Sequence, residues 1–160
     1  MATRPSFSTM RQQFSVIYRD GNIDWVGEKI GGKVGENIAL GKTDPNAGFT
    51  NACAIRMSYS LNYSGAPVAR GSWSTVSGAD RKWYIFRIRD LLPYLHQTFG
   101  KADKTVKSPK EADYAGVKGI IVFSVNFRDA SGHATLWDGS NCSDHCYFPR
   151  ATEASIWLLK

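Results

Sequence analysis

Long hydrophobic runs are absent from the sequence, and no apolar segment approaches the roughly 20 residues that a membrane-spanning helix needs. We therefore expect no membrane insertion. The first residues, MATRPSFSTMRQQF, lack the apolar core of a signal peptide, so we expect no leader. Clusters of lysine and arginine are also absent, although the formal net charge is +6. Such dispersed charge does not favour nucleic acid, and fits a carboxylate-rich polymer or solubility alone.

The composition is that of a folded globule rather than a disordered chain. Hydrophobic residues make up 42% of the 160 residues and aromatic residues 12%, enough for a core of useful size. Neither internal repeats nor a second domain is evident, so residues 1–160 are expected to form one domain. Helical patterns come first and strand patterns later, which predicts the α+β class.

The hydrophobic periodicity predicts the main elements. Phe7, Met10, Phe14, Ile17 and Tyr18 share one helical face, with Ser6 or Ser8 as the cap. Further helices are expected from Thr50 or Asn51 onward and over residues 89–100, with Asp90 as a cap of the latter. Strands are expected at residues 81–88, 119–127, 132–139 and 155–160, the second of them central. The Gly-rich and polar stretches 27–49 and 101–113 are expected to be loops.

One cysteine stands alone at the first turn of a predicted helix, in the motif NACAIRMSYS at residues 51–60. The backbone N–H groups and the dipole of a helix N-terminus favour the thiolate, which is the nucleophilic form. The same N–H groups can bind the oxyanion of a tetrahedral intermediate. Cys53 is therefore a candidate nucleophile. For a lone cysteine, a purely structural role in the helix packing is the competing interpretation.

A histidine in the motif GHATLWDG could pair with this thiol. His133 begins a predicted strand, and Gly132 before it leaves room for close approach. A histidine at a strand end facing a helix N-terminus has the arrangement that a Cys–His pair requires. The other two histidines fit this role less well, because His96 lies on an amphipathic helix and His145 lies between two cysteines.

A third group should orient the imidazole ring. Asp144, Asn126 and Asp138 are the candidates. Asp138 points away from His133 if the strand is regular, because side chains alternate between the two faces. Spacing alone does not choose between Asn126 and Asp144.

The remaining two cysteines lie four residues apart in NCSDHC. Cys142 and Cys146 are expected to form a local disulfide that holds Asp144. A zinc site with His145 is the weaker interpretation, because structural zinc sites use paired short-gap ligands. We expect neither a metal nor a cofactor. A disulfide in a chain without a leader needs an explanation, since the cytosol keeps thiols reduced.

Two motifs, NACAIRMSYSLNYSG and GHATLWDGSNC followed by an acidic residue, resemble the fourth family of type VI secretion amidase effectors. The resemblance implies a papain-like, NlpC-type cysteine peptidase fold. It matches Cys53 to the family's nucleophile, His133 to its general base, and Asp144 to its third catalytic position.

The resemblance further implies an antibacterial toxin that hydrolyses the amide between γ-D-glutamate and meso-diaminopimelate in peptidoglycan stems. Such effectors are made in the cytoplasm, secreted by the type VI apparatus, and act in the periplasm of a neighbouring cell. A cognate immunity protein occludes the active site. Injection explains the missing leader, the periplasm suits a disulfide, and a basic surface suits a polymer of carboxylates.

Two alternatives to this function stay open at the level of sequence. The Cys53–His133 pair could serve another hydrolase or an acyltransferase. Alternatively, the chain could be a basic binding module for an anionic polymer, with Cys53 merely structural. The reactivity of the thiol separates these two alternatives.

Overall fold

The structure is a computed structural model that describes residues 2–125 and 132–160. Its helices are α1 (Phe7–Ile17), α2 (Ile23–Ile30), α3 (Gly32–Thr43), α4 (Cys53–Asn62) and α5 (Ile88–Phe99), with short 3-10 helices η1 (Glu111–Tyr114) and η2 (Phe148–Arg150). Its strands are β1 (Thr75–Ser77), β2 (Trp83–Ile85), β3 (Lys104–Lys107), β4 (Gly119–Ser124), β5 (Gly132–Trp137) and β6 (Glu153–Leu158). The expected α+β class is confirmed.

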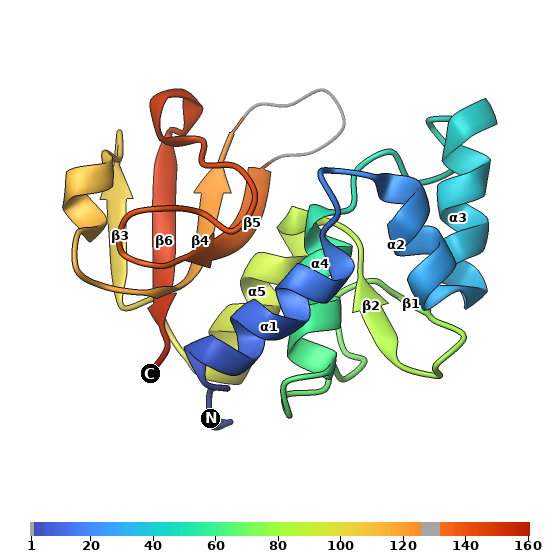
Figure 1. Ribbon diagram of the computed structural model, residues 1–160, viewed down its shortest axis with the longest axis horizontal. Coiled ribbons are helices and arrows are strands. Elements are labelled where there is room, and N and C mark those ends of the chain that lie inside the picture. The colour runs from blue at the N-terminus through green and yellow to red at the C-terminus, as the bar shows by residue number, and fades with distance from the viewer. Residues whose placement is uncertain (1, 126–131) are drawn as a thin grey trace.

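The larger sheet has four antiparallel strands in the order β3–β6–β4–β5, and β1 and β2 form a separate hairpin (Figure 1). The expected central strand is confirmed as β4, which pairs with both β5 and β6; Ile121 lies opposite Thr135 on one side and Ile156 on the other. Five of the six β4 residues are buried, as is typical of a strand covered on both faces. Residues 126 and 127 of the expected strand lie outside the described part of the chain.

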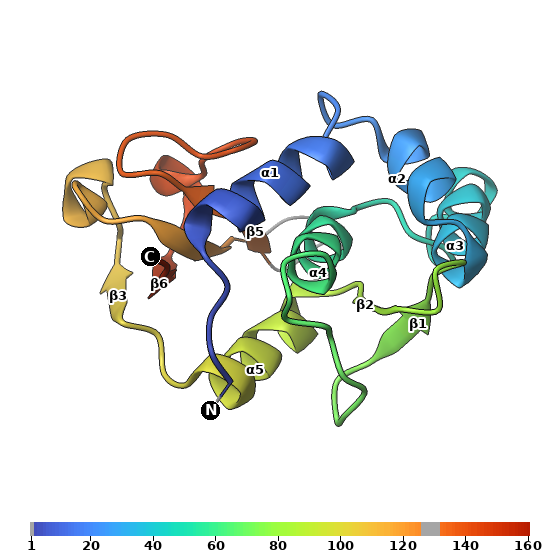
Figure 2. The same cartoon turned by 60° about the horizontal axis from the view of Figure 1, so that its bottom comes forward.

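Helix α4 is the central helix, and all its residues are buried. It lies between the larger sheet on one side and α2, α3 and the hairpin on the other, with α1 and α5 beside it (Figures 1 and 2). Helix α1 presents the expected face to it, with Phe7, Met10, Phe14 and Ile17 buried and Ser6 as the cap. Each such side chain stabilises the fold by about 1.5–3 kcal/mol through burial. No helix in the described residues is both long and apolar enough to cross a bilayer.

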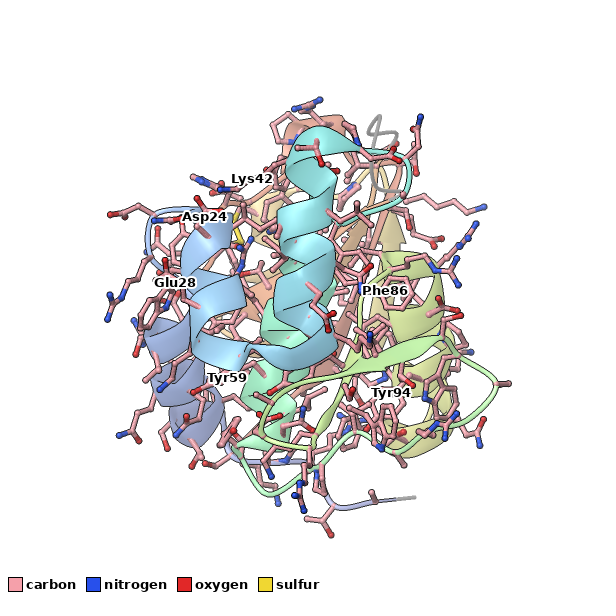
Figure 3. The ribbon with its side chains drawn as sticks, turned by 90° about the vertical axis from the view of Figure 1, so that its right-hand side faces the viewer. Asp24, Glu28, Lys42, Tyr59, Phe86 and Tyr94 are labelled. Carbon is pink, nitrogen blue, oxygen red and sulfur yellow. A yellow bond between two sulfur atoms is a disulfide. The ribbon has the colours of Figure 1, made fainter. Side chains whose placement is uncertain are left out.

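The expected loop at residues 27–49 is wrong, because α2 and α3 occupy most of it. They form an antiparallel pair joined by the ion pair between Lys42 Nζ and Asp24 Oδ1 at 2.6 Å (Figure 3). The glycines that suggested a loop permit close packing instead. A Cβ on Gly41 would lie 2.1 Å from the carbonyl oxygen of Phe49, so only glycine lets the chain return so near to α3.

Three other expectations need correction. The polar stretch 101–113 contains edge strand β3 and part of η1 rather than only loop, because pairing with β6 satisfies its backbone. The strand expected at residues 81–88 is limited to β2, since Ile88 already begins α5. Asp90 does not cap α5: Arg87 precedes the helix, and the Asp90 carboxylate accepts a hydrogen bond from Arg87 Nε at 2.7 Å.

Candidate active site

The lone thiol lies where the sequence predicted it. Cys53 is the first residue of α4 and is only 2% exposed. Helix α4 packs against β5. The sulfur of Cys53 lies 3.9 Å from the carbonyl oxygen of Gly132. The helix N-terminus and the strand that carries the candidate base therefore meet at the sulfur atom.

The residues before the helix make a hydrogen bond that bears on catalysis. The N-cap of α4 is Ala52, which has no side-chain cap, so the expectation that Thr50 or Asn51 caps the helix is wrong. Asn51 precedes the cap, and its Oδ1 accepts a hydrogen bond from the backbone N–H of Cys53 at 2.9 Å. This is an Asx-type turn, in which a side chain satisfies a donor that the helix leaves free. The N–H expected to bind an oxyanion thus already has an acceptor in the side chain of Asn51.

His133 is the second residue of β5 and is 5% exposed. A Cβ on Gly132 would lie 2.3 Å from the carbonyl oxygen of Phe123 in β4, so glycine permits the two strands to lie this close at the start of β5. The imidazole of His133 interacts with the thiol of Cys53 and stacks edge-on to Tyr147, with ring centroids 4.7 Å apart. The Cys–His proximity that the spacing suggested therefore exists.

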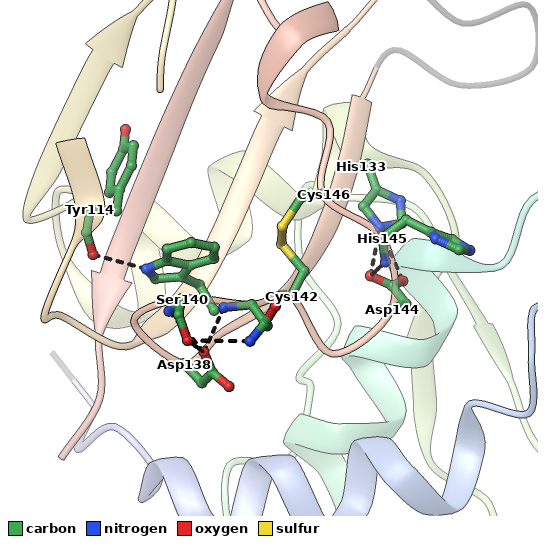
Figure 4. Close-up of a disulfide and its surroundings, with 10 residues drawn as sticks. Tyr114, His133, Asp138, Ser140, Cys142, Asp144, His145 and Cys146 are labelled. Atoms are coloured by element: carbon green, nitrogen blue, oxygen red, sulfur yellow. Dashed lines mark hydrogen bonds and ion pairs between the residues drawn. A yellow bond between two sulfur atoms is a disulfide. The ribbon is translucent and has the colours of Figure 1, made fainter. Parts of the chain in front are cut away.

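Asp144 lies against the imidazole of His133 (Figure 4). His133 Nε2 lies 3.0 Å from Asp144 Oδ1, which leaves Nδ1 for the thiol. The carboxylate also accepts the backbone N–H of His145 at 2.5 Å. Its side chain is 1% exposed. A buried carboxylate with these two donors is held in a single position beside the ring.

The path of the chain after β5 explains why Asp144 reaches His133. Trp137 and Cys142 form a β-bridge, and the backbone N–H of Ser143 donates to the carbonyl of Leu136 at 2.9 Å. The chain thus turns back along β5 in an antiparallel direction. Continuing this path carries Asp144 toward the start of the strand. The return is a long-range feature that residue spacing does not reveal.

The disulfide closes this returning segment around Asp144. Cys142 and Cys146 are bonded, with their Cα atoms 5.5 Å apart (Figure 4). Because each thiol is used in the bond, the two cysteines are not available as the zinc ligands of the alternative interpretation. Asp144 is the middle residue of the closed loop, so the covalent link restricts the segment that carries the carboxylate.

The other candidates occupy different places. Asp138 lies at the far end of β5, where Oδ1 accepts the backbone N–H groups of Ser140 and Asn141. Asn126 lies outside the described residues. The ring of His96 packs edge-on against Trp157 with centroids 5.3 Å apart, in agreement with a structural role. Of the three proposed orienting groups, Asp144 is the one that the described structure places on the imidazole.

Opposing effects set the charge of the pair. Burial lowers the pKa of His133, but the hydrogen bonds to Asp144 and Cys53 outweigh it and raise the pKa to about 9. Burial raises the pKa of Asp144, whereas its hydrogen bond to His133 and the charge of that ring hold it below its ordinary value. At neutral pH the pair is therefore imidazolium and carboxylate, poised to stabilise a thiolate and to donate a proton.

Comparison with known proteins identifies the family. The family model described as type VI secretion system (T6SS), amidase effector protein 4, matches residues 49–158. The chain belongs to this family.

Solved structures of family members agree over nearly the whole chain. The effector Tae4 from Enterobacter cloacae is 44% identical, with a TM-score of 0.89 and complete coverage of both chains. Tae4 from Salmonella typhimurium, in complex with the immunity protein Tai4 from Enterobacter cloacae, is 42% identical, with a TM-score of 0.88; the match covers 98% of this chain and 100% of that one. Among curated proteins there is no match.

Membership of this family makes the chain an enzyme, an antibacterial amidase effector of type VI secretion. The papain-like, NlpC-type fold expected from the two motifs is confirmed. The alternative of a binding module without catalysis is therefore not retained. Sequence reasoning missed Tyr18, Arg56 and Tyr147, which gather around the candidate triad, because each resembles an ordinary packing residue in its own element.

We predict that the pH dependence of the amidase follows the charge of His133. With the imidazolium as the predicted proton donor to the leaving amine, kcat/KM should fall as the pH rises through about 9, the pKa of this group. Asp144→Asn removes the charge that raises this pKa, and the alkaline limb should move toward the ordinary value of 6.5. Rates measured from pH 5 to pH 10 test this. An alkaline limb unchanged by Asp144→Asn would contradict it.

Stability should follow the same titration. The pKa of His133 is raised in the folded state, so protonation stabilises the fold fully below about 6.5 and this contribution is lost as the pH rises through about 9. The melting temperature of the wild-type protein should decline across this pH range, and the melting temperature of His133→Gln should decline less. Thermal unfolding of both proteins at each pH provides the measurement. Parallel declines would show that His133 does not cause the loss.

The disulfide should matter for activity more than for folding. Intact mass after alkylation should reveal one reactive thiol in the oxidised protein and three after reduction. A link across so short a loop adds about 2 kcal/mol on the loop-entropy model. Freeing the Asp144 segment should lower kcat/KM by about 10–100-fold, as small misplacements do. Three reactive thiols in the oxidised protein, or full activity after reduction, would refute the prediction.

Proposed function

We propose that residues 1–160 act as a single amidase domain that hydrolyses the amide between γ-D-glutamate and meso-diaminopimelate in peptidoglycan peptide stems. The observation that supports the catalytic assignment is that three side chains contact one another in sequence. Cys53 at a helix N-terminus meets His133, and Asp144 holds the opposite ring nitrogen at 3.0 Å. This is the arrangement that a cysteine nucleophile and its general base require. The bond itself is proposed from the family resemblance.

In this mechanism the thiolate of Cys53 attacks the scissile carbonyl carbon, and the carbonyl electrons move to its oxygen. His133, held by Asp144, protonates the departing amine as the tetrahedral intermediate collapses to a thioester. The ring then accepts a proton from water, which hydrolyses the thioester and regenerates the thiol. The acid–base steps should contribute about 10²–10⁴-fold to the rate.

The oxyanion requires a hydrogen-bond donor, and the candidate donor already has an acceptor in this structure. The backbone N–H of Cys53 donates to Asn51 Oδ1 at 2.9 Å. During acyl transfer the substrate oxygen would replace Asn51 Oδ1 as the acceptor of this N–H or share the N–H with it, because the substrate oxygen develops a full negative charge there. A neutral carboxamide oxygen is a weaker acceptor than an oxyanion, so the exchange is favourable in the transition state.

The biological setting is proposed on the same basis. Relatives are crystallised with the immunity protein Tai4, and we propose that a protein of this kind blocks the Cys53 site in the producing cell. The type VI apparatus would deliver the enzyme to the periplasm of a target cell, where an oxidising environment maintains the Cys142–Cys146 disulfide. The net charge of +6 favours association with a polymer of carboxylates.

Mass spectrometry of Gram-negative peptidoglycan tests the proposal. The sacculus is digested with the oxidised protein or with its Cys53→Ala variant, and the fragments are compared. New fragments that end at γ-D-glutamate, absent with the variant, would establish the activity and its bond together. An unchanged fragment profile from folded wild-type protein would show that the Cys–His pair serves another substrate.

A further inference from the structure

Arg56 lies one turn along α4 from Cys53 and has an unusual environment for an arginine. It is 9% exposed, and its Nε is buried without a hydrogen-bond partner. Within residues 2–125 and 132–160, its guanidinium makes no ion pair with a carboxylate. Arginine stays charged at any pH of interest and is rarely buried unless it is paired. Among the described residues, the guanidinium of Arg56 therefore has no carboxylate partner.

The surroundings of Arg56 are those of a binding site rather than of a core. Its Cζ lies 5.4 Å from the centre of the Tyr18 ring, a cation–π contact that leaves the edge of the guanidinium free for an anion. Its charge also reaches Tyr147: burial raises the pKa of that phenol, and Arg56 opposes the rise. Tyr147 in turn stacks on His133. Arg56 thus borders the catalytic imidazole through a shared aromatic neighbour.

The aromatic neighbour of Arg56 also borders a surface cleft, whose lining does not include Arg56 or Cys53. Tyr18 lines a cleft of about 340 Å³ between α1 and the segment that carries the disulfide, together with Arg11, Phe14, Ser15, Asp138, Asn141, Cys142 and Ser143. The carboxylate of the candidate triad, Asp144, hydrogen-bonds to His133 and to the backbone of His145. Its charge is therefore committed to the imidazolium and does not neutralise Arg56.

Spacing along the helix matches the spacing within the substrate. Side chains three residues apart on a helix have Cβ atoms about 5–6 Å apart on one face. In γ-D-glutamate, the scissile γ-carbonyl and the free α-carboxylate are separated by a short carbon chain of about this length. With the γ-carbonyl on the sulfur of Cys53, the α-carboxylate falls within reach of Arg56.

We propose that Arg56 binds the free α-carboxylate of the glutamyl residue whose γ-carbonyl is attacked by Cys53, and so makes the enzyme select for this charge. This inference rests on the proposed function, since it assigns a subsite to the same reaction. A bidentate guanidinium–carboxylate pair fixes the orientation of the acyl group and supplies the missing counter-charge. Stems in which that carboxylate is amidated should be poor substrates.

Two synthetic stem peptides provide the test, one with D-glutamate and one with D-isoglutamine, which carries an amide in place of the α-carboxylate. The wild-type protein should cleave the first with a kcat/KM about 10–100-fold higher, the range expected for a charge-assisted hydrogen bond. Arg56→Met should lose this preference, because its kcat/KM should fall on the D-glutamate peptide and stay unchanged on the D-isoglutamine peptide. Arg56→Lys should keep part of it, because it keeps the charge but not the bidentate geometry.

Controls separate binding from folding. Arg70 is exposed and lies over the Trp83 ring at 4.7 Å, so Arg70→Met removes a comparable cation–π contact and should leave both rates unchanged. The melting temperature of Arg56→Met should not fall, since replacing an unpaired buried charge by an apolar side chain is often stabilising. If Arg56→Met fails to fold, the preference of Arg56→Lys decides the matter.

Each outcome has a distinct meaning. Cleavage of neither peptide by the wild-type protein would overturn the proposed function and this inference with it. Equal cleavage of both would leave the proposed function standing and refute the role of Arg56. A preference that survives in Arg56→Met, or an equal loss on both peptides, would show that Arg56 acts on the catalytic groups or on folding and does not read the carboxylate.

Discussion

Replacing Cys53 with alanine should lower kcat/KM for the stem peptide by at least about 10⁴-fold while leaving the fold intact. The sulfur is the atom that forms the thioester in the proposed mechanism. Removing a nucleophile typically costs several orders of magnitude because the covalent path is lost entirely. Peptide hydrolysis followed by mass spectrometry measures the loss. The small buried side chain should change stability by only a modest amount.

Two companion variants sharpen this result. His133→Ala should be about as slow as Cys53→Ala, and the double variant should be no slower than either single one, because the residues act as a unit. Iodoacetamide should modify Cys53 faster in the wild-type protein than in His133→Ala, because the imidazole interacts with the thiol. A correctly folded Cys53→Ala protein that still digests peptidoglycan would overturn the catalytic assignment.

Elements whose signal is local were predictable from the sequence. The buried face of α1 and the apolar run of β4 depend on residues close together in the chain, and both have the expected places. The helices α2 and α3 were missed because their glycines were interpreted as turn formers. At Gly41 the glycine serves contact with Phe49 instead. Tertiary packing, which periodicity does not encode, overrides propensity there.

The candidate site divides in the same way. Cys53 and His133 stand at the ends of regular elements, so their positions follow once the elements are assigned. The placement of Asp144 on the imidazole depends on the return of the chain along β5, which the bridge between Trp137 and Cys142 establishes. Arg56 gave no signal, since an arginine within a helical motif is usually solvent-exposed. Its significance comes from burial without a partner.

Asp144→Ala should lower kcat/KM by about 10²–10⁴-fold, the range of general acid–base catalysis. Its carboxylate, 3.0 Å from His133 Nε2, fixes the orientation of the ring and stabilises the imidazolium. Without this carboxylate, the lowering of the His133 pKa by burial is no longer opposed by the hydrogen bond to Asp144. Asp144→Asn should retain more activity than Asp144→Ala, because a carboxamide oxygen can still accept the Nε2–H and orient the ring.

The comparison of the two variants separates orientation from charge. If Asp144→Asn is as slow as Asp144→Ala, the charge of the carboxylate supplies most of the rate effect of Asp144. If Asp144→Asn approaches the wild-type rate, the orientation of the ring supplies most of that effect. Asp138→Asn is the matched control, because this second aspartate follows the same strand but binds backbone N–H groups at its far end, and it should leave the rate unchanged. Wild-type activity in Asp144→Ala would show that another residue holds His133, with Asn126 as the remaining candidate to test.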